Sequence, residues 1–143
     1  MFTAEILTAD AAFRRVLHRL ETQGYSILNI IPINGSRYLI VKGSWENGRK
    51  ENLLITYKRE VFFNFGKEFR EFGETGVGDS INKEDLQSAG EHDVKKIYAV
   101  FPNGIAYSIS FDEFLERAHR RTVKEGKEVF CITIHAYKRE FEI

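Results

Sequence analysis

The sequence is poor in cysteine and proline and has no long hydrophobic run. A single sulfur, at Cys131, excludes an internal disulfide and any zinc site built from two or more cysteines. This usage fits a reducing compartment, so we expect a cytoplasmic protein. No apolar stretch approaches the ~20 residues that span a bilayer, and residues 1–10 lack the pattern of a signal peptide. We therefore expect no membrane partner.

An excess of charge of either sign is also missing. The 21 lysines and arginines balance 21 aspartates and glutamates. A protein coated in nucleic acid usually carries an excess of bases, so contact with a polyanion would need a local basic face. Hydrophobic residues make up 43% of the 143-residue chain, which is a common size for one domain. We expect residues 1–143 to form a single domain that folds without a partner.

Turn residues in the first half predict a helix followed by three antiparallel strands. Apolar residues at helical spacing indicate a helix between Asp10, which can cap its start, and Gly24, which can end it. Asn34-Gly35 and Asn47-Gly48 tolerate the positive φ angles of tight turns, so they predict a three-stranded meander. Its strands are expected at residues 25–33, 37–42 and 53–65.

The second half alternates helices and strands. Ser110 and Glu113 form an S-x-x-E capping box that marks the start of a helix. The expected elements are a glycine-rich loop at 66–80, a helix capped by Ser80 or Asn82 and ended by Gly90, a hairpin at 96–109, a helix from Ser110 to Gly126 and a strand at 129–137. The order α-β-β-β-loop-α-β-β-α-β predicts an α+β fold with a mixed, mostly antiparallel central sheet flanked by three helices.

Basic residues gather on two of the predicted helices. The groups are Arg14, Arg15 and Arg19 on the first helix, and Arg117, Arg120, Arg121 and Lys124 on the last. Cationic stripes of this kind can follow phosphates, and the two helices would form a nucleic-acid groove if they flank one face of the sheet. The alternative is a solvated helix face, because Glu113 and Glu116 each precede an arginine by four residues and can pair with it.

Glycines lead into the predicted helix that follows residue 80. They let the backbone approach a ligand, and a helix N-terminus attracts anions, so Gly76, Gly78 and Ser80 are candidate phosphate contacts. Asp79 adds negative charge at the same place, which leaves turn formation as the alternative. Just before this segment lie Phe62, Phe63, Phe65, Phe69 and Phe72. They either form core under the loop or meet a second copy of the chain, so a homodimer is expected.

Common catalytic motifs are missing. The four histidines show no spacing that would place two on one metal ion, and the sequence has neither a G-x-S-x-G elbow nor a phosphate-binding P-loop. Cys131 lies in a predicted strand, where a lone cysteine is more often a small buried hydrophobe than a nucleophile.

The element order and one strand resemble a known nuclease family. A helix, a three-stranded meander, a helix and further strands, together with Arg37-Tyr38-Leu39-Ile40-Val41-Lys42, look like the core of the PD-(D/E)XK superfamily, which includes archaeal Holliday-junction resolvases. In those nucleases acids on adjacent strands hold Mg²⁺ while a lysine orients the attacking water. Here Ile40 stands where the family has the acid that precedes the lysine.

The resemblance therefore implies one of two outcomes. The first is a scaffold that binds DNA without the standard active site, and the second is a Mg²⁺-dependent DNA nuclease or resolvase with a rearranged site. In the rearranged site Asp79 and Glu84 would hold the metal, with Lys58 as the cation that positions water; these three are the candidate catalytic residues. We favour the nucleic-acid-binding protein, with the nuclease and a homodimeric interaction domain as alternatives. No cofactor is expected except Mg²⁺ in the nuclease.

Overall fold

A six-stranded sheet forms the centre of the fold. The computed structural model describes residues 8–57, 78–101, 104–122, 124–133 and 136–143, and of residues 78, 79, 124 and 133 only the backbone. The strands of the large sheet, in spatial order, are β1 (Tyr25–Ile33), β2 (Tyr38–Trp45), β3 (Asn52–Tyr57), β5 (Val94–Val100), β6 (Ile105–Ser110) and β9 (Lys138–Glu142). β3 and β5 run parallel, and the other neighbours are antiparallel.

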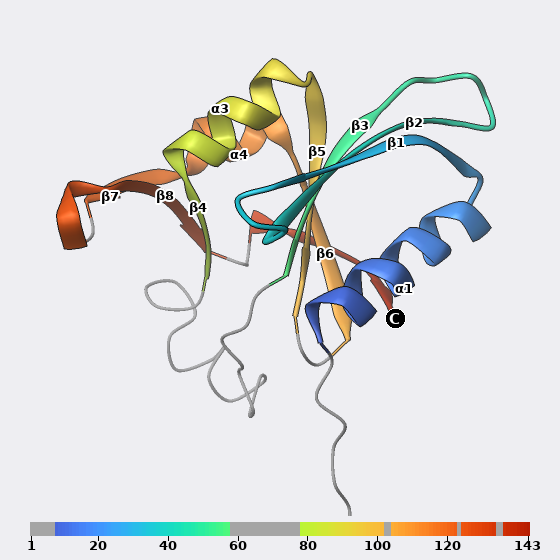
Figure 1. The fold of residues 1–143 in the computed structure, drawn as a ribbon, viewed down its shortest axis with the longest axis horizontal. Coiled ribbons are helices and arrows are strands. Elements are labelled where there is room, and N and C mark those ends of the chain that lie inside the picture. The colour runs from blue at the N-terminus through green and yellow to red at the C-terminus, as the bar shows by residue number, and fades with distance from the viewer. Residues whose placement is uncertain (1–7, 58–77, 102–103, 123, 134–135) are drawn as a thin grey trace, which may run out of the picture.

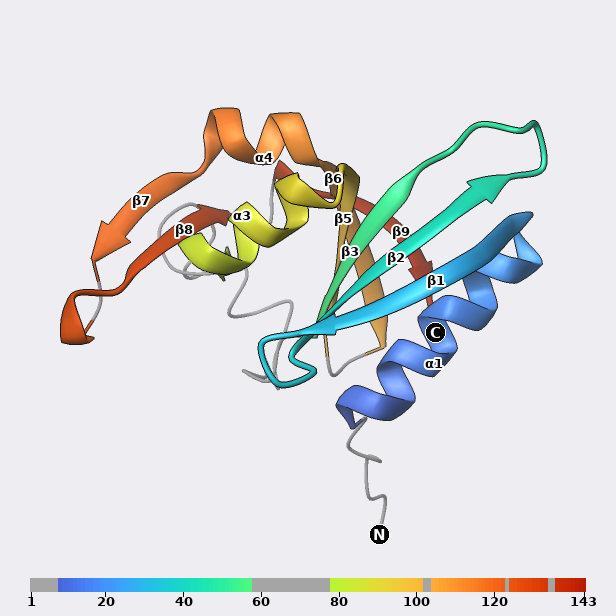
Figure 2. The same cartoon turned by 45° about the horizontal axis from the view of Figure 1, so that its top comes forward.

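A smaller sheet and three helices surround the large sheet. The small sheet has the order β4 (Gly78–Asn82), β8 (Glu128–Thr133) and β7 (His119–Thr122). The helices are α1 (Ala9–Thr22), α3 (Lys83–Glu91) and α4 (Phe111–Arg117), and a short 3-10 turn, η1, spans Lys124–Gly126. The predicted α+β class, with a mixed and mostly antiparallel sheet flanked by three helices, is confirmed. α1 lies on one side of the large sheet, and α3, α4 and the small sheet lie on the other (Figures 1 and 2).

Each face of the large sheet carries its own hydrophobic core, because successive side chains of a strand point to opposite faces. On one face, the apolar stripe of α1 packs against β2, β3 and β5, with Val16 and Leu20 fully buried against Leu53 and Ile55. On the other face, Ile40, Leu54 and Ile97 pack against residues of α3, α4 and β8. The central strands are therefore buried on both sides.

The predicted hairpins are present. Asn34, Gly35 and Ser36 have φ angles of 51°, 62° and 66°, and Ile33 pairs with Tyr38, so the β1–β2 loop has four residues rather than the expected two. At the next turn Gly48, with φ 84°, donates its N–H to the Trp45 carbonyl at 2.8 Å. β5 and β6 form the third hairpin, whose turn residues 102 and 103 lie outside the described residues.

Helix starts follow the capping rules, with one shift. Ser110 Oγ accepts a hydrogen bond from the Glu113 N–H at 3.1 Å, which confirms the predicted start of α4. At α1, the cap is Thr8 rather than Asp10, since Thr8 Oγ1 accepts from the Ala11 N–H at 3.2 Å. Asn82 holds the N-cap position of α3 without a side-chain cap bond.

The last predicted helix is too long. α4 ends at Arg117 because Ala118 is extended, with φ −71° and ψ 143°, and residues 119–122 form β7 instead. β7 pairs with β8 along its whole length. Strand pairing far along the chain therefore overrides the local helical pattern of residues 118–126, and the predicted helical stripe of Arg117, Arg120, Arg121 and Lys124 is wrong.

The final predicted strand and the glycine loop also differ from the structure. The strand expected at 129–137 is two strands: β8 ends at Thr133 in the small sheet, and β9 pairs with β6 in the large sheet. Residues 78–80 belong to β4, which pairs with β8, and not to a loop. Residues 58–77, with the five phenylalanines, Lys58 and Gly76, lie outside the described residues. No helix within the described ranges is long and apolar enough to cross a membrane.

Candidate functional site

The two predicted arginine groups lie on opposite sides of the large sheet. Arg14, Arg15 and Arg19 are exposed on α1, which packs on one face. Arg117 is on α4, which packs on the other face through Phe111 and Phe114. The predicted groove between the two helices is therefore wrong, since a six-stranded sheet separates them (Figure 2). The guanidinium of Arg19 instead lies over the Phe141 ring, 5.4 Å from its centroid.

β7, η1 and the start of β8, residues 119–122 and 124–128, belong to a hairpin that we call the basic arm. It holds four basic and two acidic residues, so it carries a net charge of +2 in a chain whose net charge is zero. All four β7 residues are exposed. Figure 1 shows the β7–β8 hairpin at the edge of the molecule, pointing away from the large sheet. The arm is thus a local basic surface that the overall composition conceals.

The small sheet also contains Ser80, one of the predicted phosphate contacts, on the strand β4. Ser80 pairs with Cys131, which pairs in turn with His119. Asn82 and Arg121 are likewise the two neighbours of Val129 across β8. β8 therefore lies between Ser80 of β4 and His119 of β7, so sheet pairing and not a shared helix face brings these two residues near each other.

The ion pairs of the arm leave one arginine available. Glu128 contacts both Lys83, at 3.1 Å, and Arg120, at 3.7 Å. Arg121 is exposed and forms no ion pair with another described residue. Arg117 pairs with Glu113 at 3.2 Å, as the alternative of a solvated helix face predicted. Exposed pairs contribute little stability, so Arg120 can exchange its glutamate for a phosphate.

The proposed metal ligands do not converge in the described part of the chain. Glu84 is exposed in the first turn of α3, the backbone of Asp79 lies in β4, and Lys58 is outside the described residues. No three His, Cys, Asp or Glu side chains in the described ranges are close enough to share a metal ion. β2 and β3 also contain no acidic residue. The rearranged Mg²⁺ site stays a prediction.

Asp85, one residue after Glu84, has a structural contact instead. It is buried, and its Oδ2 accepts a hydrogen bond from Asn34 Nδ2 at 3.0 Å. Burial raises the pKa of the Asp85 carboxyl, although the hydrogen bond from Asn34 opposes that rise. This contact fastens the start of α3 to the β1–β2 loop.

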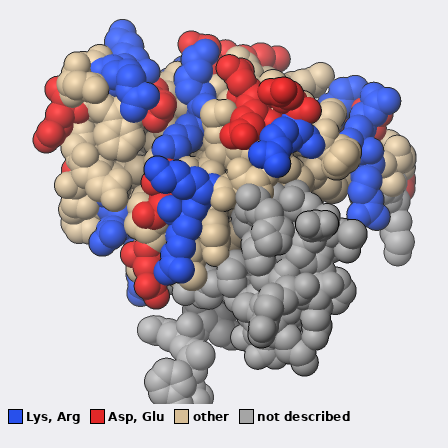
Figure 3. Space-filling model, turned by 180° about the vertical axis from the view of Figure 1, so that it is seen from behind, with Lys and Arg blue, Asp and Glu red and all other residues tan. Residues whose placement is uncertain are grey.

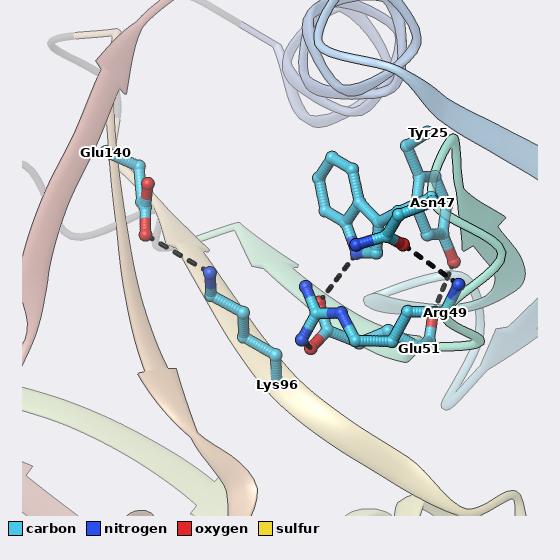
Figure 4. Close-up of polar contacts among 7 residues, drawn as sticks. Tyr25, Asn47, Arg49, Glu51, Lys96 and Glu140 are labelled. Carbon is cyan, nitrogen blue, oxygen red and sulfur yellow. Dashed lines mark hydrogen bonds and ion pairs between the residues drawn. The ribbon is translucent and has the colours of Figure 1, made fainter.

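A second polar group, which was not predicted from the sequence, lies on the α1 side of the large sheet. We call it the Tyr98 cluster; it consists of Trp45, Arg49, Glu51, Lys96, Tyr98, Ser108 and Glu140. Lys96 and Tyr98 point to one face because they are two residues apart on β5, and Tyr98 is paired with Ser108 on β6. Figure 4 shows Lys96 directed toward Glu140 on one side, and Arg49 and Glu51 together on the other.

Glu140 anchors the β9 side of the Tyr98 cluster. Its Oε1 accepts a hydrogen bond from Ser108 Oγ at 2.5 Å and lies 3.2 Å from Lys96 Nζ. Burial acts to raise the pKa of Glu140, but the Ser108 hydrogen bond and the Lys96 ammonium outweigh it and leave that pKa below its usual value. Glu140 is therefore ionised in the folded protein at neutral pH.

Glu51 anchors the hairpin side. Its Oε1 accepts from Trp45 Nε1 at 3.0 Å, and its Oε2 lies 3.2 Å from Arg49 (Figure 4). The hydroxyl of Tyr25 donates to the Glu51 carbonyl at 2.6 Å, which fixes the backbone at the start of β3. The side chain of Glu51 thus has both oxygens engaged.

Tyr98 lies between these two anchors. Burial, followed by the negative charges of Glu140 and Glu51, raises the pKa of Tyr98, so the phenol stays protonated. The side chain is 2% exposed, and its hydroxyl makes no hydrogen bond to a described residue. The Lys96 ammonium lies 5.1 Å from the centroid of its ring. Alternation of Lys96 and Tyr98 with the apolar residues of β5 was the one sequence signal for this cluster.

The visible charge pattern on the back of the molecule is mixed. Figure 3 shows groups of lysines and arginines with groups of aspartates and glutamates beside them on that face. No protein-family model, curated protein or solved structure matches this chain. The relationship to the PD-(D/E)XK superfamily is therefore still a prediction, and function has to be argued from geometry.

Proposed function

We propose that the chain is a cytoplasmic nucleic-acid-binding protein that contacts DNA through the basic arm. The observation that carries this proposal is the exposed strand β7, in which Arg120 and Arg121 belong to an arm of net charge +2 in a chain whose net charge is zero. An arginine fork can form two hydrogen bonds with a phosphate, or with the edge of a guanine. The arm therefore offers both charge and directional donors.

The shape of the arm suits a groove. A two-stranded β-ribbon fits the major groove of duplex DNA, which is about 12 Å wide. β7 and β8 form such a ribbon, and the outer strand has a free edge within the described sheet order β4-β8-β7. Ser80 and Asn82 are polar residues of β4, which β8 separates from the arginines of β7. We expect the arm to enter the groove and β4 to approach the backbone.

The scaffold supports binding over cleavage. The chain order α1, β1, β2, β3, β4, α3 and β5 follows the order of the nuclease resemblance except that the extra strand β4 precedes α3. The described strands β2 and β3, however, offer no carboxylate for a metal ion. A nuclease-like scaffold with a basic arm and without acids on these strands is suited to holding DNA.

A binding assay with matched charge changes tests this proposal. Anisotropy of a labelled duplex would be titrated with wild-type protein, with the Arg120→Gln/Arg121→Gln variant and with the Arg14→Gln/Arg15→Gln variant. An arginine contact is worth about 1–3 kcal/mol, so loss of both arm arginines should weaken binding by about tenfold or more. The α1 variant loses the same charge from the opposite face and should bind as wild type does. Equal weakening in both variants would refute the arm.

A cleavage assay and a mass measurement distinguish the two alternative functions. Branched and linear DNA are incubated with the protein with and without Mg²⁺. Metal-dependent cleavage that disappears in Lys58→Ala, Asp79→Ala and Glu84→Ala would establish the nuclease. Neither binding nor cleavage, together with a dimeric mass in solution, would favour the homodimeric interaction domain.

A further inference from the structure

β1 is an outer strand of the large sheet that carries exposed apolar side chains. It stands first in the order β1-β2-β3-β5-β6-β9, so β2 pairs with one of its edges and no described strand pairs with the other (Figure 2). Five of its nine residues are exposed, among them Leu28 at 76% and Ile30 at 40%. In the described part of the chain, Leu115 of α4 is the third exposed large apolar residue. Two of these three side chains therefore lie on one strand edge.

Two other outer strands are protected by charge, and β1 is not. Soluble proteins often place charged residues on a free strand edge, because its unpaired N–H and C=O groups can pair with another chain. At the opposite edge of the large sheet, four of the five residues of β9 are charged, and β7 of the small sheet carries Arg120 and Arg121. Residues 22–36, which contain all of β1, include no charged residue in a chain that is 29% charged. β1 is thus an edge that can accept a neighbouring strand.

Apolar side chains lie on both faces of β1, because its register against β2 shifts around Leu28. Beyond this bulge, Ile30 pairs with Val41, which belongs to the core on the α1 side. Ile31 packs against the core on the other side of the sheet. Directly opposed residues of two antiparallel strands point to the same face, so an added strand would cover apolar surface on both faces of β1.

We infer that β1 pairs with β1 of a second copy of this chain, antiparallel across a twofold axis, so that the large sheets of two copies join edge to edge. Such a contact is self-complementary, since each copy offers the same strand. With Asn29 on the axis, Leu28 of each copy lies opposite Ile30 of the partner subunit. The two exposed apolar residues of β1 then cover each other.

Charges at the two ends of β1 favour this occupant and this direction. The first charged residues outside the neutral stretch are Glu21, before the start of β1, and Arg37, after its end. Both are exposed, and neither forms an ion pair with another described residue. Antiparallel pairing brings the Glu21 end of one copy to the Arg37 end of the other, whereas parallel pairing would bring like charges together. The charges around β1 therefore complement those of its own copy.

The contact is narrow, so we expect a dimer that dissociates at micromolar concentrations. Pro32 has no N–H to donate, and the bulge at Leu28 shortens the regular part of the strand. Small interfaces are typical of weak association. The inference is independent of DNA binding, because the basic arm belongs to the small sheet and β1 to the large one.

Sedimentation velocity of the full chain without DNA tests the contact. The mass of the wild type should rise from that of one chain to that of two across micromolar concentrations. Leu28→Lys places a charge on the edge of both copies and should weaken dimerisation about tenfold or more. Leu115→Lys is the matched control, because it replaces an exposed leucine on α4, and it should dimerise as wild type does. Far-UV circular dichroism checks that both variants fold.

Two outcomes of this experiment would overturn the inference. One is a wild type that stays monomeric throughout the range, which would leave the β1 edge for a strand of another protein. The other is a dimer that Leu28→Lys and Leu115→Lys weaken equally, which would place the contact elsewhere.

Disulfide cross-linking tests the antiparallel direction. In a Cys131→Ser background, Asn29→Cys should form a dimer-linking disulfide on mild oxidation, because residues that face each other across antiparallel strands are close enough to bridge. Ser26→Cys is the control, since its two copies would lie about 20 Å apart along the paired strands, at about 3.3 Å per residue. Cross-linking of both variants at the same rate, or of neither, would contradict the pairing of β1 with its own copy.

Discussion

Gly43 of β2 is a position where adding a single methyl group should destabilise the fold strongly. An added Cβ would overlap the carbonyl oxygen of Ser26 and lie 2.6 Å and 2.7 Å from Cζ and Oη of Tyr25. Overpacking of this kind costs about 1–3 kcal/mol. Movement of Tyr25 would also break its hydrogen bond to the Glu51 carbonyl, worth about 0.5–1.5 kcal/mol. Gly43→Ala should therefore lower the free energy of unfolding by about 2–4 kcal/mol.

Urea unfolding followed by far-UV circular dichroism measures this change. Gly90→Ala is the matched control, because Gly90 lies in α3 and a Cβ there meets nothing nearer than Phe111 Cε1 at 4.0 Å. Alanine in an unstrained helical position should raise the free energy of unfolding by about 0.4–1 kcal/mol. A Gly43→Ala protein within about 0.5 kcal/mol of wild type would refute the close approach of β1 and Tyr25 to this glycine, because surface substitutions fall in that range.

Three further changes test single contacts of the fold. Thr56→Val keeps the shape of a buried side chain whose Oγ1 has no hydrogen-bond partner among the described residues. The free energy of unfolding should therefore rise by about 1 kcal/mol, which urea unfolding would show as a higher midpoint. A lower midpoint would contradict this. Ser110→Ala removes the cap bond to Glu113 and should cost about 1 kcal/mol in the same assay, and an unchanged midpoint would argue against the cap. The pKa of Glu140 is lower in the folded than in the unfolded chain, so its contribution to stability is present above the unfolded value and is lost as pH falls through the folded one. Melting temperatures of Glu140→Gln should thus fall less steeply than those of wild type on acidification, and parallel curves would count against the Ser108 and Lys96 contacts.

Local signals predicted the parts of the fold that depend on neighbours in sequence. Asn34-Gly35 adopts positive φ angles at both residues, and Ser110 caps α4, because turn and cap geometry is decided by a few adjacent residues. The prediction that Arg120 and Arg121 lie in a helix is wrong because contacts distant in sequence decide the structure there. The i, i+4 pair of Glu116 and Arg120 favours a helix by a few tenths of a kcal/mol, whereas a whole ladder to β8 stabilises the strand.

The candidate sites depended on contacts that sequence spacing does not encode. Whether α1 and α4 share a face depends on the side of the large sheet on which the chain places each helix, which no local pattern fixes. Glu51 and Glu140 approach Tyr98 from a hairpin and from the edge strand β9, where the register shifts between Ala106 and Tyr107 of β6. Such a cluster becomes visible when the pairing of distant strands is known.

The dependence of DNA affinity on salt tests the central claim about the basic arm most directly. Log affinity is plotted against log salt concentration for wild type, Arg121→Gln and Arg14→Gln. Each phosphate contact contributes nearly one unit to the slope, so Arg121→Gln should reduce the slope by about 1, and Arg14→Gln should leave it unchanged. An unchanged slope in Arg121→Gln, or the same reduction in Arg14→Gln, would show that the arm does not hold the nucleic acid.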